Sequence, residues 1–123
     1  MTKKKILVVD DEIDLVEIMR LRFEEAGYEM ISAHDGNEAL EKARREKPDL
    51  IILDLMLPKM DGHKVCGLLK KDLRYTKIPI IILTAKVHEE DIRLSEEVGA
   101  DAHFTKPVEY PVFLDKIKGL LNR

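Results

Sequence analysis

The stretch Leu50-Ile51-Ile52-Leu53-Asp54 is a run of four apolar residues that ends directly on a carboxylate. Two other runs have the same form, because Ile6-Leu7-Val8-Val9 leads into Asp10-Asp11 and Ile80-Ile81-Ile82-Leu83 leads into Thr84. Uninterrupted apolar runs of this length are typical of strands that are buried on both faces of a parallel sheet. These stretches therefore predict the centre of such a sheet.

Two further strands and five helices complete the expected pattern. Ala102 to Thr105 leads into Lys106-Pro107, and Tyr28 to Ala33, the least apolar of the five runs, is expected at a sheet edge. Helices are expected after Asp11, near Asn37, after Asp61-Gly62, over about 88–98 and from Pro111. Their apolar faces would be Val16, Met19, Phe23 and Ala26; Ala39, Leu40 and Ala43; Val65, Leu68 and Leu69; Ile92 and Val98; and Phe113, Ile117 and Leu120. Strands and helices that alternate in this way imply right-handed crossovers with helices on both faces of the sheet.

The composition is that of one ordinary intracellular domain. The 123 residues carry a net charge of −3, with 21 basic and 24 acidic residues intermixed, so no direct contact with DNA is expected. No apolar stretch approaches membrane length, and the first run is too short for a secretory signal. The lone Cys66 excludes an internal disulfide and suits a reducing compartment. We therefore expect residues 1–123 to form a single cytoplasmic domain that does not insert into a membrane.

Reactive side chains follow the predicted strands at the point where each strand ends. In open α/β sheets, ligands bind outside the carboxyl ends of the strands, at the point where the strand order reverses. If the first and third strands are neighbours, Asp10, Asp11 and Asp54 flank that point. Thr84 and Lys106 should reach the same edge, so the sequence predicts three carboxylates, one hydroxyl and one ammonium close together.

This set of groups can hold a divalent cation and accept a phosphoryl group. The Asp54 carboxylate is a competent nucleophile toward phosphorus. Crowded carboxylates repel one another, and Mg²⁺ relieves the repulsion while it leaves room for phosphoryl oxygens. Phosphoryl transfer needs positioning and charge neutralisation above all, which Lys106 and the Thr84 hydroxyl can supply.

Each of these residues also has an ordinary structural role to play. An aspartate after a strand is often the N-cap of the next helix, and Asp10 or Asp11 could be that cap. Thr84 could simply close a strand, and Lys106 before Pro107 could form a plain turn. The functional interpretation therefore depends on all of them occurring together at strand ends.

Four motifs, with their spacing, carry a resemblance to a known family. They are Val8-Val9-Asp10-Asp11-Glu12, Leu53-Asp54-Leu55-Met56-Leu57-Pro58-Lys59-Met60-Asp61-Gly62, Leu83-Thr84-Ala85 and Thr105-Lys106-Pro107. From Lys4 to Leu121 the chain resembles the receiver domain of a two-component response regulator, specifically the single-domain chemotaxis and relay type. The resemblance implies a flavodoxin-like (βα)5 three-layer sandwich, with a five-stranded parallel sheet in the order 2-1-3-4-5.

The resemblance also implies a role for each matching residue. Asp54 would be the phosphoacceptor. Asp11 would bind Mg²⁺ (or Mn²⁺) directly, Asp10 would bind it mainly through water, and the backbone carbonyl of Met56 would complete the protein ligands together with Asp54.

Three residues would act on the phosphoryl group from the other side. Thr84 would move its hydroxyl toward the phosphoryl group, and Lys106 would be the ion-pair partner of that group. Pro107 matches a family proline that follows a cis peptide bond, which would aim Lys106 into the site.

The sequence departs from the family pattern at two places. The family usually has Tyr or Phe three residues before the lysine, as a rotamer switch coupled to the threonine, whereas this chain has His103. An imidazole can swing and titrate, so His103 is either a switch or an ordinary solvent-facing histidine. Met56 and Lys86 occupy positions that tune hydrolysis of the phosphoryl group in this family, and a thioether cannot orient an attacking water.

Three other classes of function are weaker. Haloacid dehalogenase phosphatases need a second aspartate two residues after the nucleophile, where this chain has Met56. A flavodoxin-like cofactor binder needs a phosphate-binding loop after the first strand, but Asp10-Asp11-Glu12 would repel phosphate. An interaction domain that has lost phosphorylation would not need the complete set of reactive residues.

We therefore expect a stand-alone receiver without an effector domain. It would accept a phosphoryl group on Asp54 from a phosphohistidine of a sensor histidine kinase or a histidine phosphotransfer protein. It would not be a turnover enzyme, although it would assist its own phosphorylation and slow autodephosphorylation. Output would pass to a protein target through the face formed by residues 88–98, strand 102–105 and the last helix, or by relay of the phosphoryl group.

Overall fold

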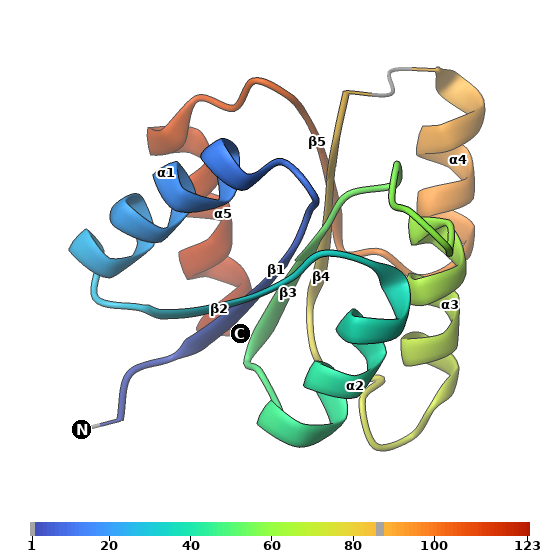
Figure 1. Cartoon of the computed structure of the whole chain (residues 1–123), viewed down its shortest axis with the longest axis horizontal. Helices are drawn as coiled ribbons and strands as arrows, with labels where there is room; N and C mark the ends of the chain where they lie inside the picture. The colour runs from blue at the N-terminus through green and yellow to red at the C-terminus, as the bar shows by residue number, and fades with distance from the viewer. Residues whose placement is uncertain (1, 86–87) are drawn as a thin grey trace.

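The computed structural model describes residues 2–85 and 88–123. Its strands are β1 (Lys5–Val9), β2 (Glu29–Ala33), β3 (Leu50–Leu53), β4 (Ile80–Thr84) and β5 (Ala102–Thr105). Its helices are α1 (Ile13–Glu25), α2 (Gly36–Glu46), α3 (Gly62–Lys71), α4 (Glu89–Glu97) and α5 (Tyr110–Leu121). Strands and helices alternate along the chain, as predicted (Figure 1).

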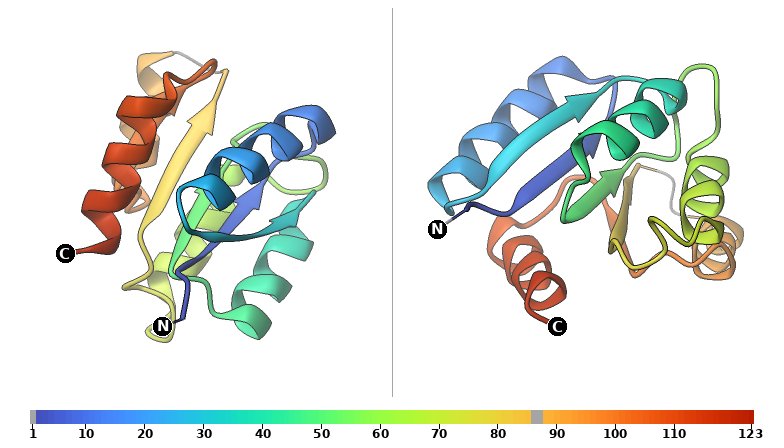
Figure 2. Two further views of the ribbon diagram at one scale, coloured as in Figure 1. Left: turned by 90° about the vertical axis from the view of Figure 1, so that its left-hand side faces the viewer. Right: turned by 90° about the horizontal axis from the view of Figure 1, so that it is seen from below.

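The sheet is parallel, and its strand order is β2-β1-β3-β4-β5. This order confirms the flavodoxin-like α/β prediction, including the edge position of β2 and the central position of β3. Figure 2 shows the strand arrows running toward one edge of the sheet. The direction of the strand order reverses between β1 and β3, which is where Asp10 and Asp54 leave the sheet.

The central strands are buried because helices cover both faces of the sheet. Helices α1 and α5 cover one face, where Phe23 and Phe113 pack with ring centroids 6.1 Å apart. Helices α2 and α3 cover the other face through small and branched side chains such as Ala43 and Val65. The two groups of helices lie on opposite sides of the strands in Figure 1. Burial on both faces explains why β1, β3 and β4 have nearly uninterrupted apolar sequences.

Three predicted apolar positions are exposed, and two more, Leu40 and Val98, are only partly buried. Ala26 is exposed because it caps the end of α1, where Gly27 turns the chain with a φ of 92°. Leu68 is 45% exposed, since α3 instead turns Val65, Cys66 and Leu69 inward. Ile92 is 37% exposed because α4 stands away from the core. The apolar pattern was therefore read too broadly at these three positions.

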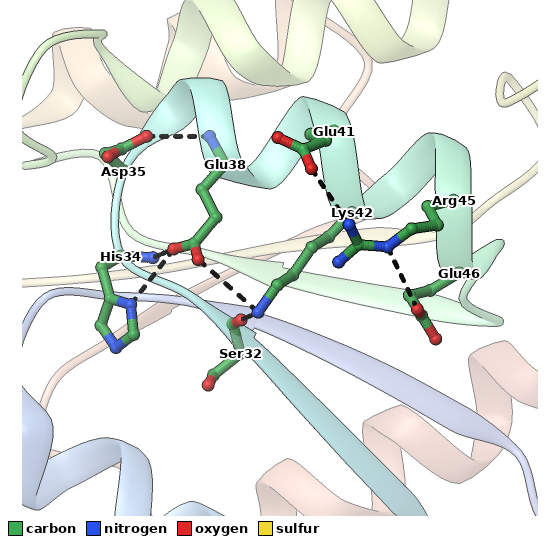
Figure 3. A network of polar contacts seen from close by, with 8 residues as sticks. All are labelled: Ser32, His34, Asp35, Glu38, Glu41, Lys42, Arg45 and Glu46. Atoms are coloured by element: carbon green, nitrogen blue, oxygen red, sulfur yellow. Dashed lines mark hydrogen bonds and ion pairs between the residues drawn. The ribbon is translucent and has the colours of Figure 1, made fainter.

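Helix α2 begins at a reciprocal set of polar contacts (Figure 3). The Asp35 side chain accepts a hydrogen bond from the backbone N–H of Glu38 at 2.8 Å, and the Glu38 side chain accepts one from the backbone N–H of His34 at 2.6 Å. These contacts satisfy donors that the helix itself leaves unpaired. Asp35 also lies 3.7 Å from the Lys59 ammonium, so the start of α2 contacts the loop that follows β3.

None of the helices in the described part of the chain is long and apolar enough to cross a membrane.

The start of β4 is held by a charged network around Asp101. Its Oδ2 atom accepts hydrogen bonds from Lys70 Nζ at 2.9 Å and from the backbone N–H of Ile80 at 2.8 Å. Its Oδ1 atom accepts one from Arg123 at 2.5 Å. Burial acts to raise the pKa of Asp101, but these hydrogen bonds outweigh it, so the pKa lies below its ordinary value. The carboxylate thereby joins α3, β4 and the end of the chain.

We expect Asp101→Asn to lower the free energy of unfolding by about 1–3 kcal/mol at pH 7, because the amide leaves a partly buried donor unpaired. A depressed pKa stabilises the fold above the ordinary carboxyl pKa, and that contribution is lost as the pH falls through the folded value. The difference from wild type should therefore narrow below about pH 4. Urea unfolding at several pH values measures this, with exposed Asp115→Asn as the control. A pH-independent difference would contradict the charge argument.

Candidate functional site

Four neighbouring strands bring the predicted residues to one edge of the sheet. Asp10 directly follows β1, Asp54 directly follows β3, Thr84 ends β4, and Lys106 directly follows β5. Because these strands are parallel and adjacent, their carboxyl ends meet at the same edge. The structure therefore brings these four positions to one edge of the sheet, and their roles in a site stay predictions.

The Lys106 ammonium lies at the centre of the site. Its Nζ atom is 2.7 Å from Asp10 Oδ2, 3.0 Å from Asp54 Oδ2 and 3.0 Å from Glu12 Oε1. An ammonium has three N–H donors, so each donor can meet one carboxylate. The arrangement explains how two aspartates can lie close together in the protein, since a positive charge sits between them.

Both aspartates are almost completely enclosed. Asp10 is 1% exposed and Asp54 is 4% exposed, which is unusual for carboxylates unless they are paired. The Oδ1 atom of Asp10 accepts the backbone N–H of Glu12 at 2.9 Å, and Oδ1 of Asp54 accepts the backbone N–H of Met56 at 3.1 Å. Each carboxylate thus has one oxygen held by the backbone and the other directed at Lys106.

Burial and charge shift the proton equilibria of this group. Burial raises the pKa of Asp10, and the hydrogen bonds from Lys106 and from the Glu12 backbone offset only part of that effect. Burial acts to lower the pKa of Lys106, but hydrogen bonds to Asp10, Glu12 and Asp54 outweigh it and the pKa lies above its ordinary value. Lys106 is therefore a permanent cation in the physiological pH range.

The carboxylates can also hold a divalent cation. Asp10, Glu12 and Asp54 each offer an oxygen, and these oxygens lie within 4.8 Å of one another. With Lys106 included, the four side chains have a formal net charge of −2, which one Mg²⁺ would balance. Carboxylate oxygens are the protein ligands that Mg²⁺ prefers, so the residues present fit this ion.

Glu12 is the member of this group that sequence reasoning missed. It belongs to the motif around Asp10 and Asp11, but the sequence pattern predicts only the two aspartates as site residues. The structure brings the Glu12 carboxylate to Lys106, whereas Asp11 is exposed and lies outside the described carboxylate group. Three consecutive acidic residues directly after a buried strand were the signal that could have indicated Glu12.

The remaining predicted residues surround this group. Thr84 is fully buried, and its carbonyl accepts the backbone N–H of Lys106 at 2.9 Å. The peptide bond between Lys106 and Pro107 is cis, as the sequence resemblance implies. Met56 is 55% exposed beside Asp54. Lys86, a predicted tuning position, lies outside the described residues.

His103 lies on β5 and is half-buried. Burial lowers the pKa of His103, and nearby His63 lowers it further while Asp91 acts in the opposite direction. Within the described ranges, its buried Nε2 atom has no hydrogen-bond partner. The ring therefore interacts with residues of α3 and α4, and a switching role for His103 stays a prediction.

The first turn of α3 presses directly on the backbone of Asp54. The Gly62 N–H donates to the Leu55 carbonyl at 3.1 Å. A Cβ atom at position 62 would lie 2.3 Å from the Asp54 carbonyl oxygen and 2.7 Å from Leu55 Cα. These atoms belong to the backbone and cannot move cheaply. Glycine at this position therefore allows α3 to begin immediately beside the Asp54 segment.

Comparison with known proteins gives one consistent family. The model of the response regulator receiver domain matches residues 6–118. The alkaline phosphatase synthesis transcriptional regulatory protein PhoP of Bacillus subtilis is 50% identical over 122 residues, which are 98% of this chain and 49% of that protein. The chain spans about half the length of the curated relatives it matches.

Solved structures give the same result. A CheY-like response regulator receiver domain protein from Methanospirillum hungatei has a TM-score of 0.93 and 31% identity, with 98% of this chain and 95% of that chain covered. The BeF3-activated receiver domain of RstA from Klebsiella pneumoniae has a TM-score of 0.90 and 29% identity, with 98% and 100% covered.

We expect Gly62→Ala to destabilise the fold by about 1–3 kcal/mol, because the added methyl group overlaps backbone atoms of the Asp54 segment. Gly119→Ala is the matched control, since that glycine lies in α5 and an added Cβ meets nothing within 4 Å. The control should be stabilising by about 0.5–1 kcal/mol, as alanine is favoured over glycine inside a helix. Thermal and urea unfolding of both variants measure these effects. Equal changes in the two variants would contradict the close contact.

Proposed function

The chain belongs to the response regulator receiver domain family, and we propose on that basis that Asp54 accepts a phosphoryl group and thereby switches the domain between two signalling states. Receiver domains of two-component systems act as phosphoacceptor switches. The observation that carries the proposal for this chain is the contact of one buried ammonium, Lys106, with both Asp10 and Asp54. A nucleophile, a charge-neutralising cation and a second carboxylate lie in one small site.

The proposed reaction transfers the phosphoryl group to an Asp54 carboxylate oxygen. That oxygen attacks the phosphorus of a phosphohistidine, a new O–P bond forms, and the N–P bond to the imidazole leaving group breaks. Lys106, freed from the Asp54 carboxylate, would contact a phosphoryl oxygen, and the Thr84 hydroxyl would contact another. Such transfers depend on positioning and charge neutralisation, and the enclosed site supplies both.

Receiver domains bind Mg²⁺ at an acidic pocket, and bound Mg²⁺ neutralises charge on the transferring phosphoryl group. We propose that Asp11, Asp54 and the Met56 carbonyl bind the ion directly and that Asp10 binds it through water. This assignment follows the family resemblance. The Glu12 carboxylate lies near those of Asp10 and Asp54 and adds negative charge to the site, which supports binding of a divalent cation there. Mn²⁺ would fit the same oxygen ligands.

Receiver domains interact with histidine kinases or phosphotransfer proteins and with downstream targets. We propose that the output surface of this chain consists of α4, β5 and α5. Exposed apolar side chains support this choice, namely Ile92 and Leu94 on α4 and Val112 on α5. Thr84 lies at the end of β4 and Lys106 directly follows β5. If these two side chains moved toward a phosphoryl group on Asp54, the ends of β4 and β5 beside this surface would move with them.

Two ways of acting on a target fit the comparisons. A stand-alone receiver, as expected from the sequence, would bind a separate protein or pass the phosphoryl group onward. The PhoP relative is named as a transcriptional regulatory protein and is about twice as long, which favours a receiver that belongs to a larger regulator. The mass of the protein detected in source cells separates the two, because the chain alone has a mass of 14.2 kDa.

The proposed chemistry is a single transfer with slow loss of the phosphoryl group rather than enzymatic turnover. Met56 supports slow loss, because it stands two residues after Asp54, its side chain is exposed, and a thioether is a poor group for orienting an attacking water molecule. Lys86 would contribute to the same rate at its position after Thr84.

Asp54→Asn should abolish labelling by acetyl phosphate in the presence of Mg²⁺, since an amide is not a nucleophile toward phosphorus. Intact-mass spectrometry measures the added phosphate directly. Asp61→Asn is the matched control, because Asp61 is exposed and caps α3, and asparagine caps helices equally well. The control should be labelled like wild type. Full labelling of Asp54→Asn would refute the assignment of Asp54.

Mg²⁺ binding should depend on Asp11 more than on Asp10. Loss of a group that acts through water typically weakens metal binding by about 10–100-fold, and loss of a direct ligand should cost more. Isothermal titration of Asp10→Ala and Asp11→Ala tests this ranking, with exposed Asp14→Ala as the control. A larger loss for Asp10→Ala would make Asp10 the direct ligand instead.

A further inference from the structure

Helix α4 lacks the apolar anchor that holds the other helices to the sheet. Ser95 is the one buried side chain among its residues, and it is polar. The apolar side chains of Ile92 and Leu94 stay 37% and 41% exposed. Val98, just beyond the helix, packs only partly on the core. The attachment of α4 must therefore depend on polar contacts to an unusual degree.

A buried histidine of α3 makes those contacts. His63 is 6% exposed, and its Nε2 atom lies 3.0 Å from Ser95 Oγ and 3.1 Å from the Asp91 carbonyl oxygen. The Ser95 hydroxyl itself donates to the Asp91 carbonyl at 2.8 Å. One N–H on Nε2 can therefore be shared between the Ser95 oxygen and the Asp91 carbonyl. We call these three residues the α3–α4 tie.

The hydrogen-bond network assigns the proton of the tie to Nε2 of His63, because a lone pair there would face the Asp91 carbonyl. The other ring nitrogen, Nδ1, lies 3.5 Å from Asp61 Oδ1. The neutral Nε2–H tautomer and the imidazolium both keep the required donor. The tie therefore requires an N–H donor at Nε2 of His63, which the histidine side chain itself supplies.

The α3–α4 tie also lies next to the segment that contains Asp54 and Leu55. His63 is the second residue of α3, and its backbone N–H donates to the Asp61 side chain at 2.7 Å. The residue before it, Gly62, packs against the backbone of Asp54 and Leu55. A displacement of the Asp54 segment would thus move the first turn of α3 and carry the His63 ring with it.

We propose that His63 is a coupling residue that fastens α4 to the first turn of α3 and so links the position of α4 to the Asp54 segment. The inference rests on the proposed function, because α4 is part of the proposed output surface. It adds a second route from Asp54 to that surface, separate from the route through Thr84 and β5. In the unmodified protein the tie holds α4 in place, and its loss frees the helix locally.

Hydrogen exchange of the α4 amides in the unphosphorylated, metal-free protein tests the fastening. His63→Ala should exchange about tenfold faster in α4, the order expected when a buried hydrogen bond is lost. Ser95→Ala should have a smaller effect in the same direction, and His63→Gln, whose amide nitrogen can still donate, should restore most of the protection. Amides of β1 and β3 report any global destabilisation. The matched control is Lys64→Ala, at the exposed neighbouring position.

Exchange in α4 that is the same in His63→Ala and Lys64→Ala, after correction for global stability, would overturn the fastening. This measurement needs no phosphoryl donor, so it does not depend on Asp54 chemistry.

Coupling is tested by the NMR shift changes that Mg²⁺ and beryllofluoride, a phosphoryl mimic, cause in wild type and in His63→Ala. Chemical-shift changes should be seen in β4 and β5 of both proteins, but those in α4 should be smaller in the variant than in wild type.

Equal α4 changes in the two proteins would overturn the coupling role of His63. If beryllofluoride changed neither protein, the proposed function would fail, while the fastening of α4 would still be decided by the exchange measurement. The two failures are therefore distinguishable.

Discussion

The contact of the Lys106 ammonium with Asp10 and Asp54 is the interaction on which the site depends. Parallel pairing of β1 with β3 forces the two aspartates to leave the sheet side by side, and their enclosure removes the solvent that would screen them. Without a cation between them, the two carboxylates would repel each other and bind protons. The ammonium that follows the edge strand β5 thus reaches the carboxylates that follow β1 and β3, across two intervening strands in the case of β1.

Under the proposed function, the same cation would also take part in the change of state. A phosphoryl group on Asp54 would remove the carboxylate that Lys106 contacts and put new negative charge in its place. Lys106 would exchange its ion pair with the Asp54 carboxylate for an ion pair with a phosphoryl oxygen, so the ends of the strands would need to move little. Larger movements would occur in elements that pack weakly against the core. Helix α4 is such an element, because none of its apolar side chains is fully buried.

The sheet and the reactive strand ends could be predicted from the sequence because each depends on local patterns. Short, β-branched runs such as Ile80 to Leu83 favour strands over helices by their length and composition, and parallel topology then determines where their ends meet. Glu12 was missed because a side chain of that length can point several ways from a loop, and no pattern selects among them. The exposure of Ile92 was missed because helical periodicity shows that a face is apolar but not whether anything covers it.

The α3–α4 tie was beyond prediction for a related reason. His63 and Ser95 are distant in the sequence, and each is an unremarkable residue on its own helix. Only the packing of α3 against α4 makes them neighbours, and that packing depends on the whole sheet. Gly62 belongs to the motif that begins at Leu53, but its close contact with the Asp54 backbone is apparent only in the folded protein.

The polar attachment of α4 has a thermodynamic consequence. The denaturant dependence and the heat capacity change of an unfolding event both scale with the apolar surface it exposes. Detachment of a helix whose apolar side chains Ile92 and Leu94 are already 37% and 41% exposed would expose less new apolar surface than loss of a helix with a buried apolar face, so both quantities would be small for that event. Calorimetry and chemical denaturation would therefore report mainly the unfolding of the sheet and the other helices. Reversible detachment of α4 would contribute little to either signal.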